Sequence, residues 1–226
     1  MSKLVENLES VRSRIAAAAM RAGRDPGDVT LVAISKTHPA EMIREAAEAG
    51  QELFGESRVQ EALVKIPSLS SRLRWHFIGH LQSNKVRKVL PYFELIHGVD
   101  SLDLARDIDR IAAEMGLHHR VLLEVNVSGE GSKHGFAPEA LEASLDELLA
   151  LPRVQVEGFM TMAPLAPEAE ASRPYFAALR KLRDRLAEKS GIPLDTLSMG
   201  MSGDYEVAVE EGATLVRVGS AIFGSR

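Results

Sequence analysis

The hydrophobic positions of this chain follow two spacings, one typical of helices and the other typical of strands. The first stretch has an apolar residue every three or four positions, the period of an amphipathic helix, and it stops near Gly23. Its apolar stripe consists of Leu4, Leu8, Val11, Ile15 and Ala18. We therefore predict an N-terminal helix within residues 1–23 that packs on the rest of the protein.

Eight short runs of apolar and β-branched residues follow, and segments with helical periodicity separate them. The runs cover residues 29–36, 52–57, 73–79, 94–99, 120–127, 154–162, 196–201 and 214–223. Each run is too apolar to leave one face in water, which indicates a parallel sheet covered by helices. Eight such units in this length favour a closed (β/α)8 barrel of the TIM type, with a doubly wound open sheet as the alternative. We predict one α/β domain over residues 1–226.

Composition narrows the function classes. The 226 residues are 45% hydrophobic and 26% charged, as in globular proteins, and the formal net charge is −5, which disfavours binding to nucleic acid or to anionic membranes. The chain has no cysteine, which excludes disulfides, thiolate metal sites and thiol nucleophiles. The first twenty residues mix charged with apolar positions, unlike a signal peptide. We expect a cytoplasmic enzyme or cofactor-binding protein.

Lys36, at the end of the first predicted strand, is the first candidate for chemistry, because barrel enzymes build their sites at the C-terminal ends of strands. It shares strand parity with Val32 and Ile34, so the three side chains are expected to point into the barrel. Burial there would favour the neutral amine, which attacks carbonyl carbon and forms a Schiff base. The alternative is a lysine at the rim that extends into water.

The last two predicted strands end in segments rich in glycine and hydroxyl groups. Arg217 lies between apolar residues and needs an anion or several acceptors, while Gly219 lets a ligand approach the backbone closely. The segment 198–204, SMGMSGD, opens a helix whose first N–H groups favour an anion.

Loops after the seventh and eighth strands are the usual phosphate site in such barrels. Together with Lys36 they indicate a site for an aldehyde phosphate. The alternative is two ordinary turns, with Arg217 paired to Glu124 inside the barrel.

Several stretches of the chain resemble the pyridoxal phosphate homeostasis protein family, in the same order and over nearly the whole length. They are Ser35-Lys36, FGESRVQE (54–61), WHFIGHLQSNK (75–85), SMGMSGD (198–204) and RVGSAIFG (217–224). The resemblance implies a barrel similar to the barrel half of alanine racemase, with Lys36 carrying pyridoxal 5′-phosphate (PLP) as an internal aldimine.

The resemblance also implies the other residues of the PLP site. Those expected to hold the phosphate are Ser198, Met201, Ser202, Gly219 and Ser220. Arg217 is expected beside the ring. The family usually has asparagine where this chain has Ser57, and the serine could replace that contact only in part.

The same resemblance implies PLP homeostasis, in which the protein carries, buffers or delivers the cofactor without robust turnover. The racemase's second domain, which supplies the acid/base group on the opposite face of the cofactor, is not expected here. We expect a cytoplasmic monomer whose partners are PLP and PLP-dependent apoenzymes. The alternatives are a low-rate PLP-dependent amino-acid racemase and a Schiff-base aldolase acting on sugar phosphates.

The histidines do not predict a metal site. His76 and His80 are four residues apart, and on a strand this spacing separates them by about 13 Å, too far to bind one metal ion. His134 and Lys133 lie in the loop 131–136 after the fifth strand. Lys133 is either a solvated loop lysine or a neighbour of the cofactor rim.

Overall fold

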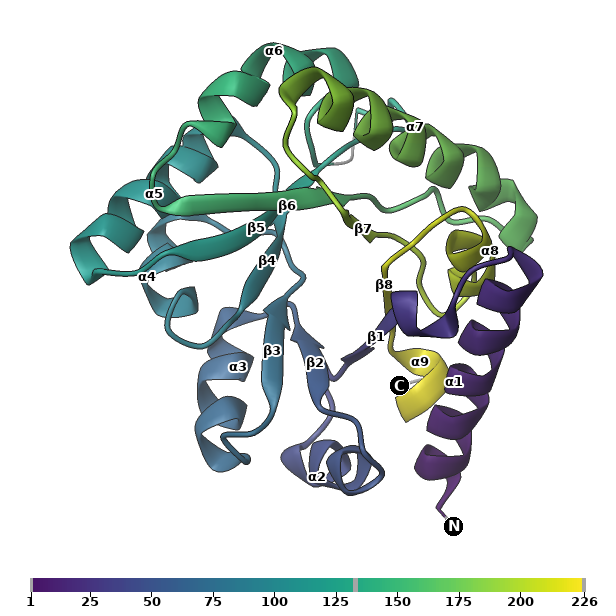
Figure 1. Ribbon diagram of the computed structural model, residues 1–226. Helices are drawn as coiled ribbons and strands as arrows, with labels where there is room; N and C mark the ends of the chain where they lie inside the picture. Colours follow the sequence, from purple (N-terminus) through teal and green to yellow (C-terminus); the bar gives the residue numbers. More distant parts are fainter. Residues whose placement is uncertain (1, 132–133, 225–226) are drawn as a thin grey trace.

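In the computed structural model, which describes residues 2–131 and 134–224, eight parallel strands close into a barrel (Figure 1). The strands are β1 (Thr30–Ile34), β2 (Leu53–Glu56), β3 (Arg74–Phe77), β4 (Leu95–Val99), β5 (His119–Glu124), β6 (Val154–Met160), β7 (Thr196–Ser198) and β8 (Leu215–Val218). Each strand pairs with the next, and β8 pairs with β1, with Arg217 opposite Val32. The predicted (β/α)8 barrel is confirmed, and the β1–β8 pairing excludes the open sheet.

Helices surround the barrel and cover the outer face of its sheet (Figure 1). They are α1 (Lys3–Arg21), α2 (Ala40–Glu48), α3 (Val59–Lys65), α4 (Val86–Val89), α5 (Leu102–Met115), α6 (Pro138–Leu149), α7 (Arg173–Ser190), α8 (Tyr205–Glu210) and α9 (Ser220–Phe223). Short 3-10 turns are η1 (Pro26–Asp28), η2 (Ile66–Ser68), η3 (Ser83–Lys85) and η4 (Ala169–Ser172). No helix within the described residues combines the length and apolar character needed to cross a bilayer.

The last predicted strand is shorter than its apolar run. β8 ends at Val218, and residues Ser220–Phe223 form the single turn α9, in which Phe223 N–H donates to Gly219 C=O at 2.9 Å. Ile222 and Phe223 are buried. A short apolar run that is buried on several sides has the same composition in a strand and in a helix, so the prediction of a strand over 214–223 was wrong at its end.

Alternate residues along the strands separate two apolar cores. The larger core lies between the strands and the surrounding helices. The smaller core fills the barrel and consists of Val32, Ile34, Leu53, Leu95, Leu122, Met160 and Leu215. The parity predicted for Val32 and Ile34 is therefore confirmed, and both point into the barrel.

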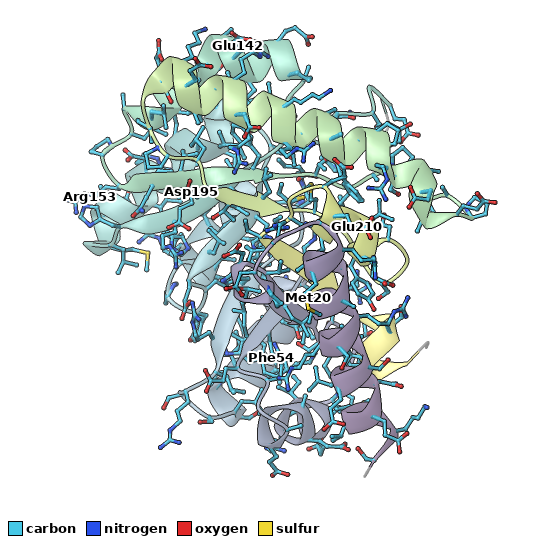
Figure 2. The ribbon with its side chains drawn as sticks, turned by 45° about the vertical axis from the view of Figure 1, so that its right-hand side comes forward. Met20, Phe54, Glu142, Arg153, Asp195 and Glu210 are labelled. Carbon is cyan, nitrogen blue, oxygen red and sulfur yellow. The ribbon has the colours of Figure 1, made fainter. Side chains whose placement is uncertain are left out.

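The N-terminal helix α1 packs against α2, α8 and α9, beside the first and last strands. Its buried face contains the five predicted apolar residues together with Ala19. At its C-terminal end, Arg21 Nε donates to Glu210 Oε1 of α8 at 2.8 Å, and Figure 2 shows Glu210 near this end of the helix. The predicted N-terminal helix is thus confirmed, and it is fixed to the barrel by both apolar and polar contacts.

Three histidines are buried in or beside the sheet. His76 of β3 and His97 of β4 lie inside the barrel, with 2.9 Å between His76 Nδ1 and His97 Nε2. Burial lowers the pKa of His76 to about 3 and the pKa of His97 well below its usual range. His119, at the start of β5, has its pKa lowered by burial to about 4. All three imidazoles are therefore neutral at pH 7.

These histidines predict an acid-sensitive fold. The unfolded chain protonates its histidines below about pH 6.5, whereas the folded chain resists protonation, so stability falls as the pH falls through this range. Between the pKa of a histidine in the unfolded chain and its pKa in the folded chain, each buried histidine lowers the free energy of unfolding by up to about 1.4 kcal/mol for every pH unit of acidification. Urea unfolding at several pH values between 7 and 5 measures this slope.

A matched pair of variants isolates one histidine. His119→Leu removes a buried titrating group, and the stability of this variant should depend less steeply on pH, by about 1 kcal/mol per pH unit. His118→Leu changes the adjacent, exposed histidine and is the matched control. Equal slopes in the two variants would contradict the assignment.

Candidate functional site

A cavity of about 570 Å³ opens at the C-terminal ends of the strands. The predicted site residues in its wall are Lys36, Ser57, Met201, Ser202, Arg217, Gly219 and Ser220. These residues come from the ends of β1, β2, β7 and β8, which barrel closure places next to one another. The structure therefore gathers an amine, a guanidinium and several hydroxyl groups around one space.

Arg217 forms the inner wall of this cavity and is buried. Its Nη1 donates to Ser198 Oγ at 2.6 Å and its Nη2 donates to Thr161 C=O at 2.9 Å. Burial lowers the pKa of Arg217 to about 10, while the negative charge of Glu124 acts to raise it. The guanidinium therefore stays charged at pH 7 and is held by neutral acceptors, and its hydrogen bonds do not include the direct pair with Glu124 that the alternative interpretation required.

Ser198 is the predicted site residue that the structure does not place in the cavity wall. Its side chain is fully buried inside the barrel, where Oγ accepts from Arg217 and lies 2.9 Å from His97 Nδ1. The alternation of the short strand β7 turns this side chain inward, beneath Arg217. Ser198 is thus positioned to orient the guanidinium, and its expected contact with the phosphate stays a prediction.

Two residues of this inner chain escaped the sequence analysis as site residues. Hydrogen bonds connect Arg217 through Ser198 to His97, and His97 lies 2.9 Å from His76. His97 shares strand parity with Leu95, which belongs to the inner core. A polar residue at an inward position of a barrel strand was the signal that could have found it.

Lys36 lies at the mouth of the cavity and is exposed. β1 ends at Ile34, so Lys36 stands two residues beyond the strand and is not enclosed by the barrel. The expectation that this lysine is buried and dry was wrong, and the alternative of a rim lysine describes its position. Its amine shares the cavity with Arg217 while remaining open to solvent.

A buried ion cluster fixes the backbone on the N-terminal side of Lys36. Lys65 of α3 donates from Nζ to Ser35 C=O at 2.9 Å and to Glu56 Oε1 at 3.0 Å. Ser35 Oγ donates to the same Glu56 oxygen at 2.7 Å. Burial raises the pKa of Glu56, and the bonds from Ser35 and Lys65 act against this rise. The cluster therefore joins β1, β2 and α3 directly behind Lys36.

The same cluster fixes the backbone on the other side of Lys36. Glu61 of α3 pairs with Lys65 and accepts the backbone N–H of Thr37. Partial burial acts to raise the pKa of Glu61, but the bonds from Lys65 and Thr37 lower it overall. Thr37 has a φ of 67°, an unfavourable backbone conformation for a β-branched residue. Residues 35 and 37 are thus both clamped, and Lys36 lies between them.

The sequence contains a signal for this cluster in the spacing of α3. Lys65 continues the buried stripe of α3 formed by Val59 and Ala62, at helical spacing. A lysine on the buried face of a helix needs a partner charge, which the nearby motif 54–61 supplies through its two glutamates.

The loops after β7 and β8 form the opposite wall of the cavity. Ser202 Oγ accepts from two backbone groups, Gly219 N–H at 3.2 Å and Ala221 N–H at 3.3 Å. A hydroxyl oxygen that accepts two hydrogen bonds has its own proton available for donation. The Ser202 hydroxyl is therefore placed to donate to an anion in the cavity, beside the exposed hydroxyl of Ser220.

Close packing shapes this wall. Gly200 has a φ of 90°, and a Cβ at this position would come within 2.5 Å of Ala208 Cβ, so only glycine fits there. The following residue, Met201, donates its N–H to Asp204 Oδ1 at 2.7 Å. These contacts fix the path of residues 200–204 before α8 begins, which places Met201 and Ser202 in the cavity wall.

Comparison with known proteins agrees with this geometry. Residues 7–226 match the family described as alanine racemase, N-terminal domain. A pyridoxal phosphate homeostasis protein of Aquifex aeolicus (strain VF5) is 46% identical over 98% of this chain and 97% of its own length. The protein of that name from Escherichia coli (strain K12) is 44% identical over 100% of this chain and 98% of its own.

Solved structures show the same fold. PipY of Synechococcus elongatus PCC7942, with PLP bound, aligns with a TM-score of 0.87 and 42% identity over 98% of this chain and 100% of PipY. An alanine racemase of Clostridium difficile 630 aligns with a TM-score of 0.78 at 18% identity, covering 100% of this chain and 57% of the racemase. The racemase likeness concerns the fold alone.

The fold and the cavity define a barrel of the alanine racemase N-terminal domain class. Within that class, the chain belongs to the pyridoxal phosphate homeostasis protein family.

The buried cluster behind Lys36 predicts a large stability effect from one substitution. Lys65→Met leaves the buried carboxylate of Glu56 without its counter-ion, which should lower the free energy of unfolding by about 3–5 kcal/mol. The double variant Lys65→Met/Glu56→Gln removes the uncompensated charge and should recover part of this loss. Urea unfolding at pH 7 measures both.

An exposed ion pair provides the control. Arg74 and Glu94 pair at 2.9 Å on the surface, and Arg74→Met should cost less than about 1 kcal/mol. If Lys65→Met costs no more than Arg74→Met, the buried cluster does not fix this part of the fold.

Proposed function

We propose that this protein binds PLP in the cavity, with its aldehyde at Lys36 and its phosphate at the loops after β7 and β8, and that it serves PLP homeostasis. The single observation that carries the proposal is the shared cavity, in which an accessible amine faces hydroxyl-bearing loops across a buried guanidinium. The family and the PLP-bound PipY structure support the same ligand.

The chemistry of the cavity walls fits both ends of PLP. A phosphate dianion needs several donors, and Ser202 Oγ–H, Ser220 Oγ–H and backbone N–H groups at the start of α9 are candidates. A Cβ at Gly219 would lie 3.3 Å from Ile34, so this position is closely packed as well as open to the cavity. Met201 and Ser57 complete the contacts that we assign to the cofactor.

Lys36 is the residue that we propose to hold the aldehyde covalently. PLP supplies an aldehyde that condenses with a primary amine to a Schiff base, with loss of water. The clamped residues Ser35 and Thr37 fix the backbone of Lys36 while its side chain stays open to solvent. A covalent bond at an open cavity mouth suits a protein that must release its cofactor again.

The presence of Arg217 favours a protein that binds PLP over an enzyme that uses PLP to turn over a substrate. A guanidinium donates hydrogen bonds and accepts no proton, so beside the PLP ring nitrogen it would not stabilise the protonated ring that makes PLP a strong electron sink. The bonds to Ser198 and Thr161 hold the guanidinium in place. The proposal includes delivery of PLP to apoenzymes by a cytoplasmic monomer, as the sequence analysis expects.

The covalent assignment predicts the behaviour of one variant. The purified protein mixed with PLP should acquire a visible absorbance band, and Lys36→Ala should lose it, because Lys36 is the only lysine among the described residues that line the cavity. Borohydride reduction followed by peptide mass spectrometry should locate the adduct on Lys36. Lys88→Ala, which changes an exposed lysine on α4, should keep both signals.

An adduct on another lysine, or PLP binding no stronger than to an unrelated protein, would overturn the proposal. The two alternative activities have their own signatures in the same preparation. A low-rate racemase would exchange the Cα proton of an amino acid for deuterium, and an aldolase would trap a sugar phosphate on Lys36 with borohydride.

The phosphate assignment predicts a selective loss of affinity. Ser202→Ala removes one hydrogen bond to a charged group, worth about 1.5–3 kcal/mol, so PLP should bind roughly 10- to 150-fold more weakly. Pyridoxal, which lacks the phosphate, should bind equally to both proteins. Fluorescence or absorbance titration with each ligand measures the difference.

The exposed Ser71→Ala is the matched control and should bind both ligands as the unchanged protein does. A parallel loss of pyridoxal and PLP affinity in Ser202→Ala would show that the hydroxyl shapes the cavity and does not bind the phosphate.

A further inference from the structure

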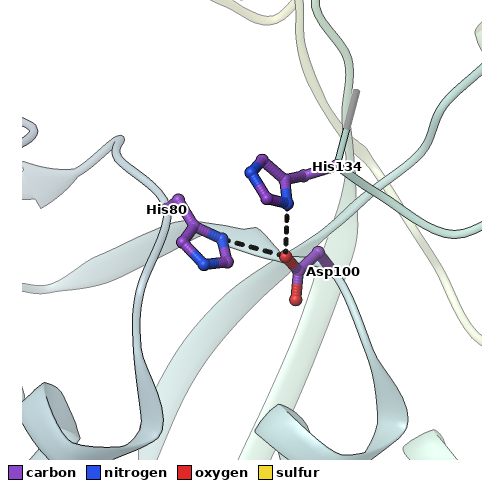
Figure 3. Close-up of side chains that lie close together, drawn as sticks. All are labelled: His80, Asp100 and His134. Atoms are coloured by element: carbon purple, nitrogen blue, oxygen red, sulfur yellow. Dashed lines mark ion pairs between the residues drawn. The ribbon is translucent and has the colours of Figure 1, made fainter. Parts of the chain in front are cut away.

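Three loops at the mouth of the barrel bring two histidines and an aspartate together (Figure 3). His80 follows β3, Asp100 follows β4 directly and His134 lies between β5 and α6. His80 Nδ1 is 3.0 Å from Asp100 Oδ2, and His134 Nδ1 is 3.7 Å from the same oxygen. The spacing of His80 from His76 along one strand gave no metal site, because the partners of His80 come from the ends of the neighbouring strands.

The donor atoms and their spacing suit a small transition-metal ion. In a tetrahedral zinc site with bonds of about 2.0–2.1 Å, neighbouring ligand atoms are about 3.3 Å apart. The distances from Asp100 Oδ2 to His80 Nδ1, 3.0 Å, and to His134 Nδ1, 3.7 Å, lie on either side of this value. Two imidazoles and one carboxylate favour Zn²⁺ over Mg²⁺ or Ca²⁺, which prefer oxygen ligands. Water can complete the coordination of a site with three protein ligands.

One adjustment is needed for a metal ion to bind. The rings of His80 and His134 are stacked, with centroids 4.1 Å apart and an angle of 16° between planes, so their nitrogen lone pairs do not converge on one point. The side chain of His134 is 59% exposed, and its ring can turn toward Asp100 without moving the barrel. The side chain of Asp100 is only 12% exposed and provides the fixed ligand.

The surroundings favour a cation at this position. Glu124 is buried at the end of β5, and burial and the nearby charge of Asp100 raise its pKa, whereas the charge of Arg217 and, to a lesser degree, His80 act to lower it. Asp100 and Glu124 therefore bring two acidic groups to this side of the barrel mouth. A bound divalent cation would offset their mutual repulsion.

We propose that His80, Asp100 and His134 form a Zn²⁺ site that joins the loops after β3, β4 and β5 at the mouth of the barrel. His80 also lines the large cavity, so the site lies on the rim of the space that we assign to PLP. The metal site is independent of that assignment, because none of its evidence involves Lys36 or the phosphate loops.

The test is a calorimetric titration of the chelator-treated, PLP-free full chain with Zn²⁺ alone. We expect one Zn²⁺ per chain and no comparable binding of Mg²⁺. His134→Ala and Asp100→Asn should each weaken Zn²⁺ binding by at least about tenfold, because each removes one of three protein ligands. His118→Ala, which changes an exposed histidine outside the cluster, should bind Zn²⁺ as the unchanged protein does.

A second measurement reports the ligand atoms directly. Co²⁺ in place of Zn²⁺ should give a visible spectrum typical of nitrogen and oxygen ligands, and His134→Ala should lose it. Circular dichroism establishes that each variant is folded. Absence of Zn²⁺ binding to the unchanged protein, or equal affinity in His134→Ala, Asp100→Asn and His118→Ala, would overturn the proposal.

Discussion

The ammonium group of Lys65, buried between α3 and the first two strands, is the constraint on which the position of Lys36 in the cavity depends. It bonds to Ser35 C=O and Glu56, and it pairs with Glu61, which accepts the N–H of Thr37. An unpaired charge at this depth would cost several kcal/mol, so the three charged groups must remain together for the fold to persist. Lys36 receives its position as a consequence, because its two chain neighbours are held by this cluster.

A second buried cation, Arg217, is held rigidly in the inner wall of the cavity. Its partners are uncharged, Ser198 Oγ and Thr161 C=O, so its charge is not cancelled within the hydrogen bonds that position it. Ser198 is oriented in turn by the buried pair His97 and His76. Groups inside the barrel therefore hold the guanidinium in place, with its charge facing the cavity. At this position the charge attracts an anionic or electron-rich ligand most strongly.

The sequence was sufficient for the architecture and for most of the cavity wall. Strand and helix periods predicted the barrel, and the rule that sites lie at strand ends led to Lys36 and Arg217. Two features were missed. The exposure of Lys36 depends on the residue at which β1 ends, which periodicity locates poorly. Helical spacing places Lys65 on the buried face of α3, but its contacts with Ser35 and Glu56 join segments that local spacing does not relate.

Barrel closure explains why groups from the two ends of the chain form one site. β1 and β8 are adjacent, with Val32 opposite Arg217 and Ala33 opposite Val218. Lys36 and Gly219 leave these two strands in the same direction, so the amine and the loops after β7 and β8 meet at the same end of the barrel. A shift of one residue in the β1–β8 register would turn Arg217 out of the barrel or displace it from this level. The pairing of the first and last strands therefore determines both the closed fold and the spacing between the amine and the cation.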